Sequence, residues 1–218
     1  MTTLIALDTS GALCSVALLH DGVFHQLTRN VVRKHNMVVL EMLDALCSNA
    51  GILPAVIEGV AYVRGPGSFT GVRLCVTAAQ AIAMTAGARV FGCTTSRLLA
   101  LHAQTLGSAA VVSVVRSRGE TCYLAAFQQF PGTTLLQQVE EEVLTDCPPA
   151  WLSDYAEMTG EPPAWLPASF KVLPMDETPA LTLLHHAREG WPATEWASVE
   201  SALPMYIYGD HPWRPVAG

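Results

Sequence analysis

The sequence Gly-Pro-Gly-Ser-Phe-Thr-Gly-Val-Arg, at residues 65–73, joins an apolar run at 59–63 to a long apolar segment at 70–86. The run predicts a strand, and the segment, closed by Gly87, predicts a helix. Glycines allow close backbone approach and the N–H groups of a helix N-terminus can hold an anion, so one interpretation is a phosphate cradle. The spacing is neither G-x-G-x-x-G nor a Walker A sequence, and no lysine follows the glycines. A tight strand-to-helix connection is therefore the other interpretation, and the chemistry favours it.

An antiparallel meander precedes this stretch. The apolar run at 3–7, the polar turn Asp8-Thr9-Ser10-Gly11 and a second run at 14–19 predict a strand, a turn and a strand. Residues 23–31 alternate well enough to predict a third strand. The chain thus opens with three short strands that are consecutive in the sequence.

A second strand, turn, strand unit lies in mid-chain, at 109–115 and 121–128. Its similarity to the first unit indicates an α/β protein of two related lobes. We place the first lobe at residues 1–105 and the second at 106–218, which is shorter and less regular. Beyond Pro131 the pattern weakens, and only one further helix, at about 182–189, is clearly indicated.

Two predicted helices, at 36–50 and 70–86, carry more apolar surface than one core face requires. One explanation is that both are central core helices. The other is that their small side chains allow close packing against a helix of another subunit. On this second explanation the candidate interface residues are Val39, Met42, Leu43, Leu46, Leu74, Thr77, Ala78, Ala81 and Thr85.

The composition limits what the chain can bind directly. Charged residues make up 14% and apolar residues 50% of the sequence, so some apolar surface is expected to meet another protein. The formal net charge of -7 has the wrong sign for neutralising many phosphates, which disfavours direct RNA binding. A short basic cluster at Arg29, Arg33 and Lys34 is more typical of a solvated face.

The sequence also bears on location. The N-terminal run contains Asp8 and no basic leader, unlike a signal peptide. The apolar stretch between Arg73 and Arg89 has 15 residues, fewer than the roughly 18 needed to cross a bilayer. Six cysteines lack any C-x-x-C pair and resemble buried hydrophobes in a reducing compartment. We therefore expect a cytoplasmic protein without membrane contact.

The stretch 65–73, taken with Leu7-Asp8-Thr9-Ser10 and the strand at 14–18, resembles the TsaB (YeaZ) family, and the resemblance extends over residues 3–85. It implies an actin-like, ribonuclease-H-like α/β fold, in which two lobes contain mixed sheets flanked by helices. Members of the family are similar to TsaD, the metal- and ATP-dependent threonylcarbamoyl transferase, and are its inactive relatives.

Two positions depart from the family pattern. An acidic residue normally opens the mid-chain turn, but this chain has Arg116 there. The family's tail has a proline and a tyrosine followed by a basic residue, whereas here Pro204 and Tyr206 are followed by Tyr208. These departures concern the second lobe and the tail, and leave the match of the first lobe unchanged.

An enzyme of this fold would need ligands that the sequence lacks. An actin-type ATPase has an acidic strand-turn-strand element in each lobe; Asp8, Thr9 and Ser10 could form the first, but Arg116 stands at the second. No histidine has another four residues later, so a TsaD-like metal site lacks its pair. We expect no catalytic residue, metal or cofactor, and a vestigial phosphate-type turn at Asp8, Thr9 and Ser10. The alternative is an actin-fold small-molecule kinase or a glycoprotease-like hydrolase.

The resemblance also implies a function. The chain would be a non-catalytic scaffold or activating subunit of the bacterial complex that makes threonylcarbamoyladenosine in tRNA. It would bind TsaD as a heterodimer through the two predicted helices and support assembly with the ATPase TsaE. A homodimer through the same helices stays open, and tRNA would be contacted only indirectly.

Overall fold

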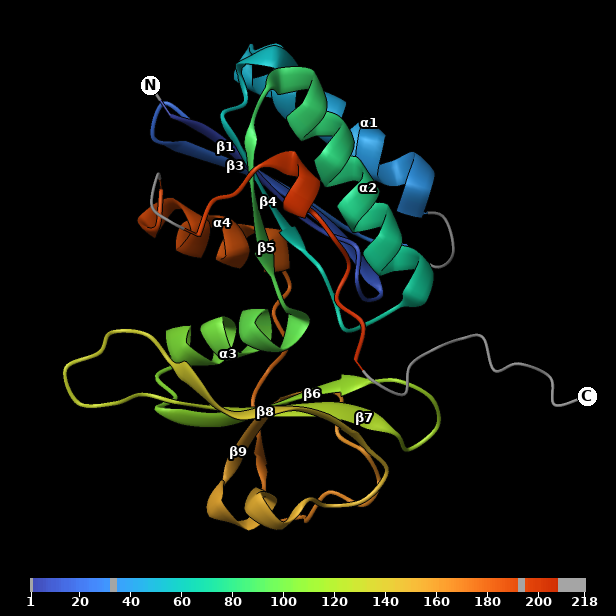
Figure 1. Cartoon of the computed structure of the whole chain (residues 1–218), viewed down its shortest axis with the longest axis vertical. Helices are drawn as coiled ribbons and strands as arrows, with labels where there is room; N and C mark the ends of the chain where they lie inside the picture. The colour runs from blue at the N-terminus through green and yellow to red at the C-terminus, as the bar shows by residue number, and fades with distance from the viewer. Residues whose placement is uncertain (1, 32–34, 192–194, 208–218) are drawn as a thin grey trace, which may run out of the picture.

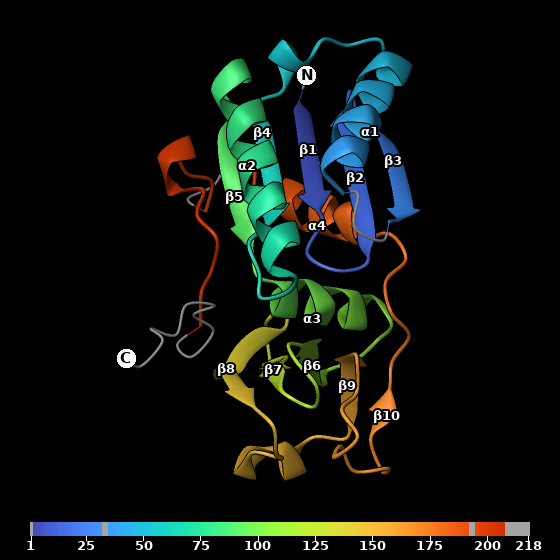
Figure 2. The same ribbon diagram turned by 90° about the vertical axis from the view of Figure 1, so that its right-hand side faces the viewer.

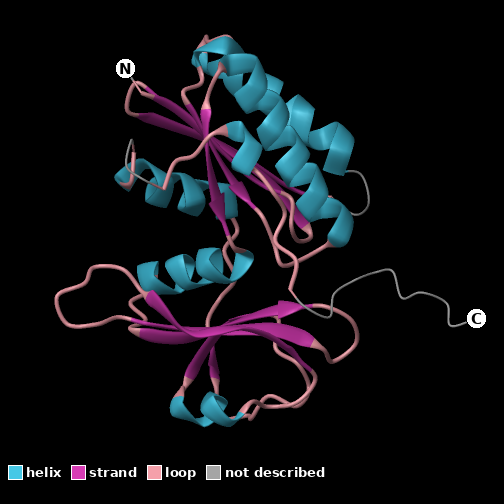
Figure 3. Ribbon diagram, viewed as in Figure 1, coloured by secondary structure: helices cyan, strands magenta, loops and turns pink. Residues whose placement is uncertain are grey.

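The computed structural model describes residues 2–31, 35–191 and 195–207, and it contains two five-stranded sheets with helices packed on them (Figures 1 and 3). The elements in chain order are β1 (Thr3–Asp8), β2 (Leu13–His20), β3 (Val23–Asn30), α1 (His35–Ala50), η1 (Pro54–Val56), β4 (Gly59–Val63), α2 (Phe69–Ala86), β5 (Arg89–Cys93), α3 (Thr95–Thr105), β6 (Ala110–Arg116), β7 (Cys122–Gln128), β8 (Gln137–Thr145), η2 (Ala150–Asp154), β9 (Glu157–Gly160), β10 (Lys171–Val172), α4 (Pro179–Glu189) and η3 (Val199–Ser201).

The first sheet has the strand order β3-β2-β1-β4-β5. β1 pairs antiparallel with β2, where Leu7 lies opposite Val16, and parallel with β4, where Leu7 lies opposite Tyr62. α1 and α2 cover one face of this sheet, and α4 covers the other (Figure 2). Because both faces are covered, every residue of β1 is buried.

The second sheet has the order β10-β9-β6-β7-β8 and repeats the same arrangement at its centre. β6 pairs antiparallel with β7 and parallel with β9, so that Ser113 lies between Ala125 and Thr159. α3 packs on this sheet and also contacts α4 of the first lobe (Figure 1). Two mixed sheets flanked by helices confirm the predicted α/β class with an actin-like arrangement.

The chain returns to the first sheet after completing the second. α4 lies within the stretch 106–218, which the sequence assigns to the second lobe, yet it packs on β1 and β2. The backbone N–H of Ala180 donates to Ser15 Oγ at 3.2 Å. Further on, Ala197 pairs with Val90 of β5, and the buried Trp196 packs against Phe91 with ring centroids 5.6 Å apart. The last described residues therefore complete the core of the first sheet.

α2 is the long helix that follows the 65–73 stretch. Its N-cap is Ser68, whose Oγ accepts from the Gly71 N–H at 3.3 Å, and its C-cap is Gly87 with φ +67°. Among helices in the described residues, α2 alone has the length and apolar composition of a membrane span, a test that core helices of soluble proteins also pass. The apolar stretch counted from Arg73 is too short to cross a bilayer, but α2 begins at Phe69 and has 18 residues. Its inner side packs on β4, and Val72, Cys75 and Ala79 are among its buried residues.

Candidate functional site

The turn between β1 and β2 is buried and internally bonded. Asp8 Oδ1 accepts hydrogen bonds from the backbone N–H of Ser10 at 2.8 Å and from its Oγ at 2.7 Å. Asp8, Thr9 and Ser10 are all buried. An aspartate that bonds the backbone two residues on is a common turn device, so this carboxylate has a structural task within its own turn.

The glycines of the 65–73 stretch lie against this turn. A Cβ at Gly71 would be 2.0 Å from the carbonyl oxygen of Thr9, and one at Gly67 would be 2.6 Å from that of Ser10. Thr9 Oγ1 donates to the Gly71 carbonyl at 2.7 Å, and the Ser68 N–H donates to the Ser10 carbonyl at 2.8 Å. These contacts are made within the chain, and they support the tight-connection interpretation of the stretch.

A cavity of about 160 Å³ lies beside the turn, between the two lobes. Its lining includes three carboxylates, those of Asp8, Glu161 and Asp176, and no Lys, Arg or His. A lining of this sign repels phosphate groups. In the described part of the chain, no three His, Cys, Asp or Glu side chains come together as a metal site. The absence of a cofactor and a metal stays a prediction.

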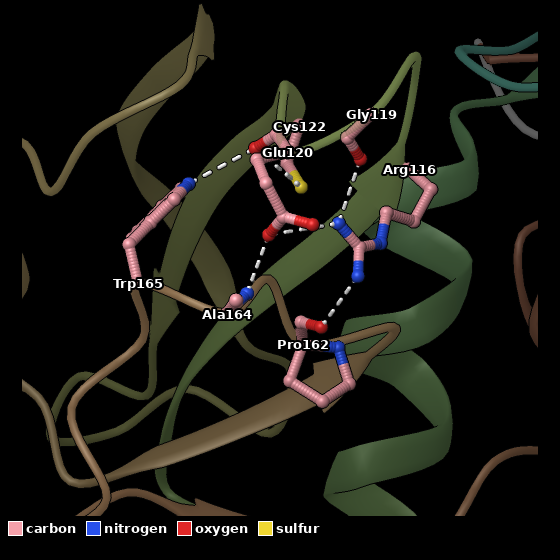
Figure 4. Close-up of polar contacts among 7 residues, drawn as sticks. All are labelled: Arg116, Gly119, Glu120, Cys122, Pro162, Ala164 and Trp165. Atoms are coloured by element: carbon pink, nitrogen blue, oxygen red, sulfur yellow. Dashed lines mark hydrogen bonds and ion pairs between the residues drawn. The ribbon is translucent and has the colours of Figure 1, made fainter.

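The turn between β6 and β7 is the counterpart of the Asp8 turn in the second lobe, since β6 pairs with β7 and β9 as β1 pairs with β2 and β4. Figure 4 shows its polar contacts. Arg116, at the end of β6, donates from Nη1 to the Gly119 carbonyl at 2.8 Å and from Nη2 to the Pro162 carbonyl at 3.0 Å. It also lies 3.3 Å from a carboxylate oxygen of Glu120. The arginine therefore joins the turn to the loop after β9, where an actin-type ATPase would need a carboxylate.

Glu120 completes this link between the turn and the loop (Figure 4). Its carboxylate accepts from the Ala164 N–H at 2.6 Å, and its backbone carbonyl accepts from Trp165 Nε1 at 2.9 Å. The hydrogen bond from Ala164, helped by Arg116, holds the pKa of the Glu120 carboxyl below its ordinary value. Arg116 and Glu120 are thus both occupied in holding the loop.

The buried cysteines are poor candidates for a nucleophile. Burial raises the pKa of Cys14 to about 11 and those of Cys75 and Cys93 to about 12. Burial likewise raises the pKa values of Cys47 and Cys122. A reactive cysteine needs a thiolate near neutral pH, so these five thiols stay protonated and unreactive.

The candidate interface residues of α1 lie inside the chain's own core. Val39 and Met42 are fully buried, Leu46 is 2% exposed and Leu43 is also buried. They face the first sheet, where α1 packs on β2. Side chains at this depth cannot touch another protein while the chain keeps this fold.

The candidates on α2 divide between its two sides. Ala78 is 6% exposed and faces the core of the first sheet. Thr77, Ala81 and Thr85 are exposed, and Leu74 is half-buried. Thr77, Ala81 and Thr85 form one row along the side of α2 that faces away from the sheet, and Leu74 lies at the edge of this row, where it also packs against the core.

Two larger apolar side chains extend this row, and sequence reasoning missed them. Phe69 is 49% exposed at the start of α2, and Met84 is 72% exposed near its end. We call the set Phe69, Leu74, Thr77, Ala81, Met84 and Thr85 the outer face of α2. Leu53 and Val56, also exposed, lie beside α2 at η1, which packs on this helix. Apolar periodicity marks such positions, but it does not say which of them water reaches.

Known proteins are similar to this chain in sequence and in fold. The family model described as "TsaD: tRNA N6-adenosine threonylcarbamoyltransferase" matches residues 25–148, more than half of the chain. The Escherichia coli protein named "tRNA threonylcarbamoyladenosine biosynthesis protein TsaB" is 33% identical over 127 residues, covering 58% of this chain and 55% of that protein. The chain belongs to the TsaD family, among its TsaB (YeaZ) members.

Another TsaB protein and two solved YeaZ-type structures are also similar to this chain. The Haemophilus influenzae protein of the same name is 43% identical over 81 residues, which cover 37% of this chain and 34% of that protein. The chain thus spans about half or less of the length of the curated TsaB relatives that it matches. Two solved structures from Pseudomonas aeruginosa cover 95% of this chain and 100% of their own. "Crystal structure of an uncharacterized protein with similarity to peptidase YEAZ" has a TM-score of 0.79 at 29% identity, and "YeaZ" has 0.78 at 28%.

The tail pattern of the TsaB family is present in part. Pro204 and Tyr206 line a small hollow over residues 66–73, and the Met205 N–H donates to the Arg64 carbonyl at 2.7 Å. Tyr208 lies outside the described residues. Of the basic cluster, Arg33 and Lys34 also lie outside them, and Arg29 lies 3.5 Å from Glu41 in an exposed pair.

Proposed function

We propose that this chain is a non-catalytic subunit that binds a TsaD-type threonylcarbamoyl transferase and supports its modification of tRNA. Family membership supports the pathway, because the E. coli and H. influenzae relatives are named as tRNA threonylcarbamoyladenosine biosynthesis proteins. The observation that carries the proposal is the outer face of α2, an exposed row of small and apolar side chains on a helix with a single charged residue.

The outer face suits packing against a helix. Thr77, Ala81 and Thr85 are short, so the axis of a second helix can come within the ordinary 8 to 10 Å of the α2 axis. Phe69 and Met84, near the two ends, add apolar area of the kind enriched in protein interfaces. On α1, Leu40 is exposed, whereas the interface residues predicted from its sequence are buried.

The second lobe supports a role without chemistry. Arg116 occupies the position of a catalytic carboxylate, and its donors bond the neighbouring backbone. The buried thiols stay protonated. The arginine stands where an ATPase of this fold would use a carboxylate, and the protonated thiols offer no nucleophile for a hydrolase.

The partner would then carry out the remaining steps. The transferase would supply the catalytic groups and most tRNA contacts, which accords with the net charge of -7 on this chain. A TsaE-type ATPase would join the assembled pair in the cytoplasm. Two copies of this chain would pair through the same outer face, so self-association and binding of the transferase would compete.

A charge in the centre of the outer face tests the proposal. Ala81→Glu adds a carboxylate there, and Ala150→Glu adds the same carboxylate to the exposed start of η2 in the second lobe. Calorimetric titration with the purified TsaD-type transferase of the same genome should show at least a tenfold loss of affinity for Ala81→Glu and none for Ala150→Glu. Thermal melts should show both variants folded.

Two outcomes would contradict the proposal. If the unaltered chain does not bind the transferase, the partnership is wrong; if Ala81→Glu binds as tightly as the unaltered chain, the docking face is wrong. Formation of threonylcarbamoyladenosine is then assayed with tRNA and each protein alone and together. Product formed by this chain alone would overturn its non-catalytic role.

A further inference from the structure

Arg73 lies between two aromatic rings at the start of the outer face. Its guanidinium carbon is 3.2 Å from the ring centroid of Phe69 and 5.3 Å from that of Tyr206. Phe69 precedes it by one helical turn, and Tyr206 reaches it from the tail that crosses the 65–73 stretch. Arginine stacks on aromatic faces in this way, and the rings fix the plane of its donors.

The hydrogen-bonding capacity of Arg73 is not used up within the described residues. Its Nη1 is buried and has no hydrogen-bond acceptor there, and no described carboxylate pairs with the side chain. A buried N–H donor without an acceptor is costly, and more so when the group is charged. This arginine therefore differs from Arg116, whose two terminal nitrogens both bond backbone carbonyls.

The surroundings indicate what kind of group would complete the site. Arg73 is the only charged residue of α2, so the outer face offers it no carboxylate. Two copies of this chain that pair through α2 would bring two arginines and no acid from that helix. Arg73 is partly exposed and both flanking rings are about half exposed, so an incoming side chain can reach the guanidinium at the rim of an apolar surface, and it bonds the buried Nη1 after displacing one of the rings. Such a site fits a planar anion held by two parallel hydrogen bonds.

We infer that Arg73 is the ionic anchor of the docking face, and that it accepts an Asp or Glu carboxylate from a helix of the TsaD-type partner. This inference rests on the proposed function and adds the chemistry of its interface. The carboxylate would lie at the Phe69 end of the outer face, while the partner helix packs along Thr77 and Ala81. Arginine and aromatic residues that become desolvated together are the usual source of binding energy in an interface.

The test compares Arg73→Met with Arg188→Met. Methionine keeps the length and helix propensity of arginine but removes its charge and donors. Arg188 is a matched control. It belongs to α4, on the opposite face of the sheet, and its guanidinium carbon lies 5.7 Å from the ring centroid of Phe24 in β3. Titration against the same purified transferase should show about a tenfold or greater loss for Arg73→Met and no change for Arg188→Met. Arg73→Lys should fall between Arg73→Met and the unaltered chain, because lysine lacks the planar fork.

A second experiment identifies the partner's carboxylate. Arg73→Glu is combined with Asp→Arg or Glu→Arg substitutions on the surface helices of the transferase, one at a time. One of these transferase variants should bind the Arg73→Glu chain at least tenfold more tightly than the unaltered transferase does. If Ala81→Glu abolishes binding while Arg73→Met does not, the proposed function stands and this inference is wrong.

Two further outcomes would also overturn the inference. Asp210 is the only acidic residue after Glu200. If Arg73→Met and Asp210→Asn lower the melting temperature of the isolated chain equally and non-additively, the acceptor belongs to this chain. If Arg73→Met weakens binding of tRNA to the assembled pair but leaves transferase binding unchanged, the acceptor is a phosphate.

Discussion

Thr9 and Gly71 are hydrogen-bonded and closely packed. Thr9 Oγ1 donates to the Gly71 carbonyl at 2.7 Å, and a Cβ at Gly71 would lie 2.0 Å from the Thr9 carbonyl oxygen. The two residues are 62 positions apart, and the contact connects the β1–β2 turn to the first turn of α2. The orientation of α2, and of its outer face, is therefore fixed by the β1–β2 turn.

Gly71→Ala should destabilise the first lobe. The added methyl group meets a backbone oxygen, which cannot move aside as a side chain can, so we expect a loss of about 1 to 3 kcal/mol in the free energy of unfolding. Gly11→Ala is the control, since nothing lies within 4 Å of a Cβ there. Urea denaturation followed by circular dichroism measures both, and equal midpoints for the two variants would contradict the close contact.

The elements around this joint could be predicted from the sequence, because their signals are local. Short apolar runs at 3–7 and 14–19 predicted β1 and β2, and the glycine-rich stretch predicted the start of α2. The nine-residue β8 was missed, since its sequence Gln-Gln-Val-Glu-Glu-Glu-Val-Leu-Thr is rich in acidic residues. It lies at the edge of the second sheet and is only partly buried, so its apolar pattern is weak.

Arg116→Asp should restore the carboxylate of an actin-type turn without restoring chemistry. The change removes two hydrogen bonds to backbone carbonyls and places aspartate beside Glu120. Because the arginine is 30% exposed, we expect only about 1 kcal/mol of destabilisation. Arg118→Asp, on the same turn, makes the same charge change and should cost less, since no described side-chain bond holds Arg118. Release of phosphate from ATP by Arg116→Asp would contradict the structural role of this turn.

Stability should depend on pH through Glu142. Burial raises the pKa of this carboxyl from 4.5 to about 7, although a hydrogen bond from Ser96 Oγ acts in the opposite direction. The folded state therefore binds more protons than the unfolded state between these values, and its stability falls as the pH rises from about 4.5 to about 7. Glu142→Gln removes this dependence. It should be more stable than the unaltered chain at pH 8, by on the order of 2 kcal/mol, and about equally stable at pH 4.5.

Ser96→Ala provides the control for this titration. Loss of the hydroxyl removes the hydrogen bond that lowers the pKa, so the decline in stability should extend to higher pH. Urea denaturation at half-unit intervals from pH 4.5 to 8.5 measures the difference between each variant and the unaltered chain. A Glu142→Gln difference that is constant across this range would show that the carboxyl titrates normally.

The position of α4 could not be derived from the sequence, although the helix itself could. Its apolar side fits any sheet, and nothing local indicates that it packs on β1 and β2 instead of the sheet that precedes it along the chain. The bond from the Ala180 N–H to Ser15 Oγ spans 165 residues. The role of Arg116 escaped prediction for the same reason, since Pro162 is 46 residues away.

Leu46→Ala and Met84→Ala should distinguish an apolar side chain that stabilises the core from one that binds a partner. Apolar periodicity in the sequence does not make this distinction. Leu46 of α1 is 2% exposed, so its truncation leaves a cavity and should cost about 2 to 5 kcal/mol of stability. Met84 of α2 is 72% exposed, so its truncation should leave the urea midpoint unchanged and weaken binding to the transferase several-fold. Affinity is measured at a temperature where both variants remain folded. If the folded Leu46→Ala chain loses as much affinity as Met84→Ala, then the α1 core contributes directly to docking and the outer face of α2 is not the whole interface.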